Sequence, residues 1–165
     1  MGTTAATVRA TRRRPAALVA LIVMQLFLSV GALGGGAVLI ASPRGGIIKL
    51  PLHDLDGSPF HDFLIPGIIL FVVFGVGPVL VAWALAREAR SAALERCNPF
   101  RHEYWGWTLS GVIGVGLVIW IAVEVLIIPS TFLQPFYAGV GVVIILLTLA
   151  PSVWAYYRRE RPRAT

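Results

Sequence analysis

The amino-acid sequence predicts an all-α membrane protein, a transmembrane four-helix bundle with both termini in the cytoplasm. Three observations carry this prediction: four long apolar segments, few charged residues, and arginines concentrated on alternate connections between the segments. The chain has 165 residues, of which 57% are hydrophobic and 13% are charged. Soluble domains carry about 25% charged residues, so most of this chain must face lipid or other helices.

Each of the four apolar segments is over 20 residues long; they cover residues 15–41, 63–86, 105–128 and 132–157. An α-helix rises ~1.5 Å per residue, so each segment is long enough to cross a hydrocarbon core of ~30 Å. We predict a single membrane domain over residues 15–157, between a basic arm of residues 1–14 and a basic tail of residues 158–165. The first segment exceeds the apolar core of a signal peptide, so we expect it to be retained.

The positively charged residues predict the orientation. Of the 14 Arg and Lys residues, four precede the first segment, four lie between the second and third, and four follow the fourth. Only Arg44 and Lys49 lie elsewhere, in the connection between the first two segments. The positive-inside rule then places both termini in the cytoplasm of a multi-pass protein of the cell membrane. We expect the bilayer, with anionic lipids at its cytoplasmic face, as the partner of this charge, and no nucleic acid.

Small and polar side chains mark one face of three predicted helices, since residues at helical spacing share a face. The first face has Gln25, Ser29, Ala32 and Gly36; the third segment has Gly106, Ser110, Gly114, Leu117, Ile121, Glu124 and Ile128; the fourth has Tyr137, Gly141, Thr148 and Ser152. Lipid offers polar groups no hydrogen bond and small residues allow close packing, so these faces predict the bundle interior. Gln25 and Thr148 lie at similar depth and are expected to pair.

Breaks and ends of the helices are also predicted. A Gly75-x-Gly77-Pro78 motif predicts a kink within the second span, serving as a hinge or as a packing feature. Ser58 is expected to cap a helix that starts at Pro59, and the second span to continue as a surface helix through Arg96. Aromatic residues near the cytoplasmic ends predict an interfacial belt: Tyr104, Trp105, Trp107, Trp154, Tyr156 and Tyr157.

Glu124 is the only carboxylate inside a predicted span. It lies about 6 Å below the outer end of that span, at 1.5 Å per residue. Carboxylates in membranes often mark proton or cation paths, so one interpretation is a functional ion site. The other is a structural role, in which Glu124 reaches the interface or pairs with Arg44, Lys49, Gln134 or a loop histidine.

The outer loop, residues 43–58, and the start of the second span carry the other candidate site, made of His53, Asp54, Asp56, His61 and Asp62. Imidazole and carboxylate groups are ligands for zinc and other divalent ions. Turn formation by Asp56 and helix capping by Asp62 explain the same residues without a metal. The spacing matches no metal signature, so no cofactor is predicted; a divalent metal at His53 and His61 remains the alternative.

Several chemistries are excluded by the residues present. Cys97 is the only cysteine, which excludes an intrachain disulfide and a CxxC redox pair. There is no Walker-type phosphate loop and no nucleophile elbow. The sequence therefore favours a protein without enzymatic activity and assigns no catalytic residue.

The stretch from Gly57 to Gly67, GSPFHDFLIPG, enters a span after the longer outer loop. In this stretch and in its topology the chain resembles small uncharacterised four-span bacterial membrane proteins of actinobacterial type, a resemblance that implies no activity. Small multidrug transporters are similar in size, but their functional glutamate is in the first span, where this chain has Gln25. Vitamin K epoxide reductase-like proteins need redox cysteines that this chain lacks.

Three functions follow as expectations. The first is a non-enzymatic accessory or scaffold subunit that binds a protein partner or forms a homo-oligomer. The second is a small oligomeric transporter or channel that uses Glu124. The third is a metal-binding module or enzyme at the outer loop.

Overall fold

The computed structural model describes residues 13–47, 51–55, 59–89, 91–98, 104–127 and 132–158. The described part is helical and has no strand, which confirms the all-α prediction. Its elements are α1 (Ala16–Ala41), the 3-10 helix η1 (Leu52–Leu55), α2 (Leu64–Ile69), the π-helix η2 (Leu70–Val76), α3 (Gly77–Arg87), α4 (Ala92–Cys97), α5 (Trp105–Ile127), α6 (Leu133–Leu149) and α7 (Pro151–Arg158).

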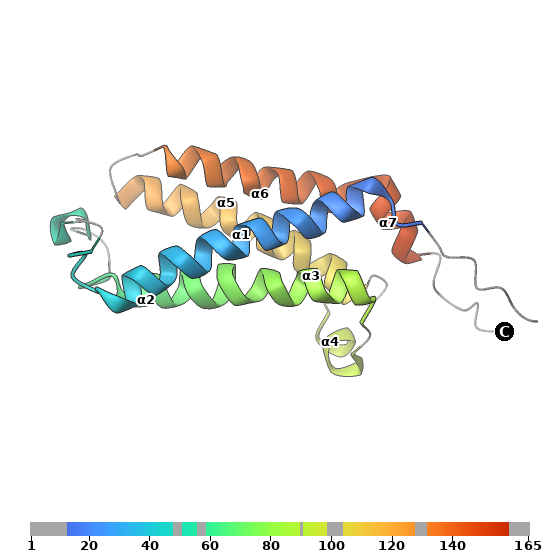
Figure 1. The fold of residues 1–165 in the computed structure, drawn as a ribbon, viewed down its shortest axis with the longest axis horizontal. Helices are drawn as coiled ribbons and strands as arrows, with labels where there is room; N and C mark the ends of the chain where they lie inside the picture. The colour runs from blue at the N-terminus through green and yellow to red at the C-terminus, as the bar shows by residue number, and fades with distance from the viewer. Residues whose placement is uncertain are drawn as a thin grey trace, which may run out of the picture.

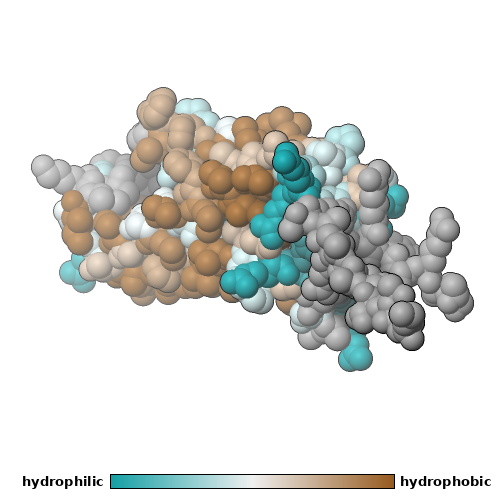
Figure 2. Space-filling model, turned by 45° about the vertical axis from the view of Figure 1, so that its right-hand side comes forward, coloured by the Kyte–Doolittle hydropathy of each residue, from teal (hydrophilic) through white to brown (hydrophobic). Residues whose placement is uncertain are grey.

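The long helices form a bundle whose described chain begins and ends at the same end (Figure 1). Among the described residues, three helices are long and apolar enough to cross a membrane: α1, the composite helix Leu64–Arg87 made of α2, η2 and α3, and α5. Joined, α6 and α7 make a fourth. α1 packs along the whole second span and against α6, while α5 packs against α6 and α3. On the face shown in Figure 2, hydrophobic residues cover the middle of the molecule, as in a helical membrane protein.

Glycines bring pairs of helices into backbone contact. A Cβ added to Gly36 of α1 would lie 2.8 Å from the Phe71 backbone nitrogen and 2.9 Å from the Gly67 carbonyl oxygen of the second span. A Cβ added to Gly114 of α5 would lie 3.1 Å from the Gly141 carbonyl oxygen of α6. The small-residue face predicted for α1 therefore lies inside the bundle, as does the α5 face from Gly106 to Ile121. Glu124 of the α5 face is half-buried, and Ile128 lies outside the described residues.

The motif in the second span produces a π-helical stretch. Pro78 has no backbone N–H, and the Gly77 N–H donates to the Val72 carbonyl five residues earlier. The Ser29 hydroxyl of α1 donates to the Gly75 carbonyl at 2.8 Å. A side chain of the neighbouring helix thus satisfies a backbone group beside the irregular turn.

The segment predicted as the fourth span, residues 132–157, is two helices, bent at Ala150 and Pro151. Pro151 offers no N–H, and α6 and α7 meet at an angle of 49°. The Ala150 N–H bonds to the Leu147 carbonyl at 3.2 Å, and the Trp107 indole N–H donates to the Thr148 carbonyl at 2.7 Å. The bend re-aims α7, so Ser152, predicted to face inward, is exposed.

The second span ends at Arg87, close to the predicted residue 86, and does not continue as a surface helix. α3 stops at Arg87 because Glu88 adopts a left-handed conformation, with φ of 52°, and α4 is a separate helix. The predicted surface helix continuing through Arg96 is therefore wrong. The start differs as well: the helix begins at Leu64, whose N–H donates to Asp62 at 3.0 Å, and Pro59 lies before it. Ser58 lies outside the described residues.

Aromatic side chains bind backbone carbonyls in the last turn of α3 and just beyond it. The Tyr104 hydroxyl lies 2.9 Å from the Ala84 and Ala89 carbonyl oxygens, the Trp105 indole donates to Ala89 at 2.8 Å, and the Tyr157 hydroxyl donates to Leu85 at 3.0 Å. The Arg14 guanidinium donates to the Ala86 carbonyl, and the Tyr156 hydroxyl to the Glu88 carboxylate.

These contacts correct the predicted aromatic belt. Trp105, Tyr156 and Tyr157 are buried, and the rings of Tyr104 and Tyr157 stack with centroids 4.7 Å apart. Trp154 is exposed, as a belt residue should be, with the Arg158 guanidinium 3.8 Å from its ring centroid. Most of the predicted belt therefore closes, from within, the end of the bundle at which the described chain begins and ends.

We predict that Gly36→Ala destabilises the protein by about 1–3 kcal/mol, because the new methyl group meets backbone atoms of the second span. Gly34→Ala is the matched control: no atom lies within 4 Å of the new methyl group, so stability should stay equal or rise by up to about 1 kcal/mol. Unfolding in a detergent titration measures both. Equal effects of the two substitutions would contradict backbone contact at Gly36.

The predicted orientation is tested with Cys97, the only cysteine of the chain. A membrane-impermeant maleimide should leave Cys97 unlabelled in intact cells and label it after permeabilisation, because the bilayer excludes the reagent. In the control chain Cys97→Ala/Ile47→Cys, the new cysteine replaces a side chain 62% exposed at the opposite end and should react in intact cells. The reverse labelling pattern would mean that the orientation is opposite to the predicted one.

Candidate functional site

Glu124 lies on α5, half-buried, and its carboxyl group is hydrogen-bonded to the side chains of Gln134 and Trp120. Gln134 belongs to α6 and is 2% exposed. An ionised carboxylate only accepts hydrogen bonds, and an amide N–H and an indole N–H both supply donors to it. Gln134 is one of the partners predicted for Glu124, and the structure places it beside the carboxyl group. Lys49, another predicted partner, lies outside the described residues.

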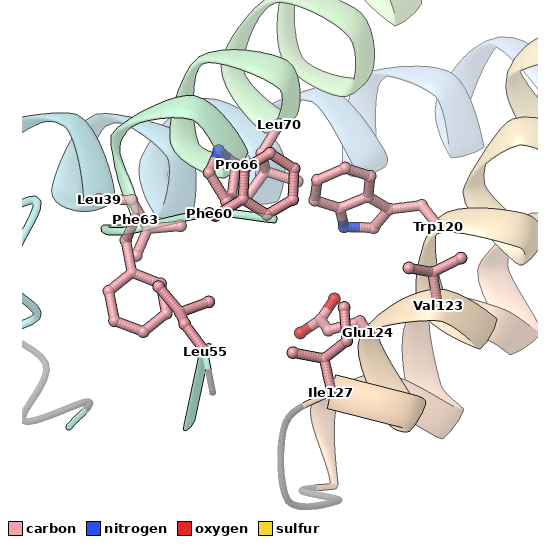
Figure 3. A pocket seen from close by; sticks show the side chains of 10 residues that line it. All are labelled: Leu39, Leu55, Phe60, Phe63, Pro66, Leu70, Trp120, Val123, Glu124 and Ile127. Carbon is pink, nitrogen blue, oxygen red and sulfur yellow. The ribbon is translucent and has the colours of Figure 1, made fainter. Parts of the chain in front are cut away.

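The Glu124 side chain walls two apolar cavities. The outer cavity has a volume of about 120 Å³ and is lined by Leu39, Leu55, Phe60, Phe63, Pro66, Leu70, Trp120, Val123, Glu124 and Ile127. The inner cavity, about 210 Å³, is lined by Leu28, Gly31, Ala32, Gly35, Leu70, Leu117, Trp120, Ile121, Glu124, Leu133, Gln134 and Tyr137. Leu70, Trp120 and Glu124 belong to both walls, and the carboxyl group points into the outer cavity (Figure 3).

The outer cavity forms where the second and third spans separate. These spans contact each other mainly through α3 and α5, and η2 adds little to that contact. Phe63 is fixed beside the gap because its N–H bonds to the Pro43 carbonyl at 2.9 Å, just after α1. Phe74 of η2 contacts Trp120, with ring centroids 6.0 Å apart. The π-helix therefore supports the indole that bonds to Glu124.

The inner cavity ends at a closed core. Leu28 and Leu117, its deepest residues on α1 and α5, are each 1% exposed. Towards the end of the bundle at which the described chain begins and ends, Gln25 Nε2 donates to Ser110 Oγ at 2.8 Å, and Ser110 Oγ lies 3.0 Å from Thr148 Oγ1. Thr148 donates its own proton to the Ile144 carbonyl at 2.7 Å, so Ser110 must donate to Thr148.

This polar junction corrects one prediction. Gln25 and Thr148 meet through Ser110 and not as a direct pair. All three side chains are at most 2% exposed, and they come from α1, α5 and α6. Their hydrogen bonds join three spans at one level, in a region where lipid offers no substitute.

Of the five outer-loop candidates, His61 and Asp62 have side chains that the structure describes. His61 is exposed, and Asp62 accepts the Leu64 N–H, which confirms its capping role. His53 and Asp54 lie in η1, where their side chains are not described, and Asp56 lies outside the described residues. Among described residues, no group of three or more His, Cys, Asp or Glu side chains is placed to hold a metal ion. The divalent metal stays an untested prediction.

Sequence reasoning missed most of the cavity wall. Trp120 lies four residues before Glu124, on the same face of α5, and this spacing was the available signal. Phe60 and Phe63 reach the cavity only because the residues before α2 pack beside α5. No local pattern in the sequence encodes that approach.

No protein-family model, curated protein or solved structure matches the chain at a significant level. The resemblance to small four-span bacterial proteins therefore stays a prediction.

We predict that Ser110→Ala destabilises the protein by about 1 kcal/mol, because it leaves two buried polar partners without their shared hydroxyl. The matched control is Thr108→Val, since the Thr108 hydroxyl bonds only to the Tyr104 carbonyl one turn earlier, at 3.5 Å. Removing the whole junction with Gln25→Leu/Ser110→Ala/Thr148→Val should restore stability in the same unfolding assay. Additive losses in the triple variant would contradict a coupled network.

Proposed function

We propose that this protein binds a small, largely apolar molecule from the outer side of the membrane, with Glu124 as its polar anchor. The observation that carries the proposal is a single carboxylate at the junction of two apolar cavities. Ligand sites are typically apolar pockets with few polar groups, and a carboxylate within a membrane span is costly unless it has a use or a partner. The predicted topology, with cytoplasmic termini in the cell membrane, supports access from the outside.

Binding is favoured over conduction by the closed core beneath the cavities. Leu28 and Leu117 separate the inner cavity from the junction of Gln25 with Ser110 and Thr148, and these five side chains are at most 2% exposed. A transporter or channel built on Glu124 requires either a rearrangement of this core or a path between copies. We therefore assign Glu124 to recognition of the ligand.

The polar chemistry of the site defines the ligand. The cavity walls carry one acidic group, so a cationic group with at most one N–H donor matches them better than an anion or a sugar. The remaining wall is aliphatic and aromatic. A protonated tertiary amine with an apolar body satisfies both conditions.

An accessory or scaffold subunit is the second candidate function. It is favoured by an outward-facing groove of about 520 Å³ between α5 and α6, lined by Trp107, Thr108, Gly111, Val112, Val115, Gly116, Ile119, Ile145, Thr148 and Leu149. Small residues let another helix approach closely. Native mass spectrometry from membranes distinguishes this function, because it requires a retained protein partner or a homo-oligomer.

We predict that N,N-dimethylbenzylamine binds the purified protein and that Glu124→Gln weakens binding at least tenfold, or by about 1.4 kcal/mol. The reason is that the substitution keeps the shape of the side chain and removes its charge. Isothermal titration calorimetry in lipid nanodiscs measures the affinity. Glu95→Gln on α4 is the control, since that carboxylate lines neither cavity. Absence of binding, or equal affinity for both variants, would reject the proposal.

A further inference from the structure

The outer cavity has aromatic walls around its single carboxylate. Phe60, Phe63 and Trp120 are arranged about the space into which Glu124 points (Figure 3). They come from two separate regions, the residues leading into α2 and the C-terminal third of α5. The cavity thus combines one negative charge with three rings.

Aromatic rings attract cations because their faces carry the negative part of a quadrupole. Cages of aromatic side chains bind methylated ammonium groups, which have an apolar surface and a positive charge. A primary ammonium would bring three N–H donors to a wall with one carboxylate, and that carboxylate already accepts from Gln134 and Trp120. A quaternary ammonium brings no N–H and leaves no donor unsatisfied.

The size of the cavity agrees with this chemistry. A protein cavity of roughly 150 Å³ holds a benzene molecule. The outer cavity, at about 120 Å³, is somewhat smaller and has room for a compact group of the size of trimethylammonium. Glu124 lies three residues before the end of α5, or about 5 Å along the helix, close to the depth of lipid head groups.

We propose that the cavity between the second and third spans binds a trimethylammonium group, with Phe60, Phe63 and Trp120 as the cage and Glu124 as the counter-charge. The group comes from a free solute or from the head group of a choline lipid in the outer leaflet. The inference rests on the proposed function, because it names the ligand class of the same site. The inference adds that the cavity prefers a cation that carries no hydrogen-bond donor.

The deciding experiment compares choline with 3,3-dimethylbutan-1-ol, which has the same shape and no charge. Calorimetry on the full chain in phosphatidylglycerol nanodiscs should show choline binding at least tenfold more tightly than the alcohol. Trp120→Leu and Phe63→Leu should each weaken choline about tenfold and leave the alcohol within twofold. Trp120→Phe, which keeps a ring, should retain most of the affinity for choline.

Phe132→Leu is the matched control for the cage, since this ring is 78% exposed and lines neither cavity. It should leave choline affinity unchanged. A second arm adds phosphatidylcholine to the nanodiscs. A rise in the apparent Kd for choline identifies the lipid head group as a competing occupant, and an unchanged Kd identifies the free solute.

Equal affinity for choline and the alcohol in the unmodified chain would overturn the trimethylammonium site. In that case, dimethylbenzylamine binding that still depends on Glu124 would leave the proposed function standing. Loss of all three ligands would reject both. The comparison uses the unmodified protein, so it decides the inference even if a cage variant fails to fold.

Discussion

The pairing of backbone carbonyl groups inside an apolar environment is the constraint on which this structure depends. Three breaks in the helices free such groups: Pro78 in the second span, Glu88 at its end and Pro151 in the fourth span. Water cannot reach these carbonyl groups inside a membrane, so hydrogen-bond donors of the protein must pair with them. A side chain from a different helix meets the backbone near each break.

These donors also decide how the helices are arranged. Ser29 ties α1 to the π-helix, Trp107 ties α5 to the end of α6, and Tyr157 ties α7 to the end of α3. Each bond fixes two elements that are distant in sequence. Close backbone contact at Gly36 and Gly114 supplies the dispersion attraction that holds helices together when lipid removes the hydrophobic driving force.

The candidate site is a consequence of this arrangement. The irregular second span stays close to α1 over its length and parts from α5 towards the end that bears Glu124. Phe74 of the π-helix supports Trp120, and Trp120 bonds to Glu124. Below this level, Leu28 and Leu117 close the bundle, so the cavities are confined to the half that contains the carboxylate. That confinement is the physical reason for assigning recognition, and not conduction, to the site.

The sequence by itself determined the helical class, the apolar segments and the inward faces of α1 and α5, because hydrophobic length and helical period are local properties. It also identified Glu124 as the intramembrane acid and Gln134 as a possible partner. Only the tertiary structure decided that Ser110 stands between Gln25 and Thr148, that α7 turns Ser152 outward, and that Phe60 and Phe63 share a cavity with Trp120. Those outcomes depend on the angles at which helices meet. Such angles are set by backbone contacts at glycines and by freed carbonyls finding donors on other helices, and no single segment contains that information.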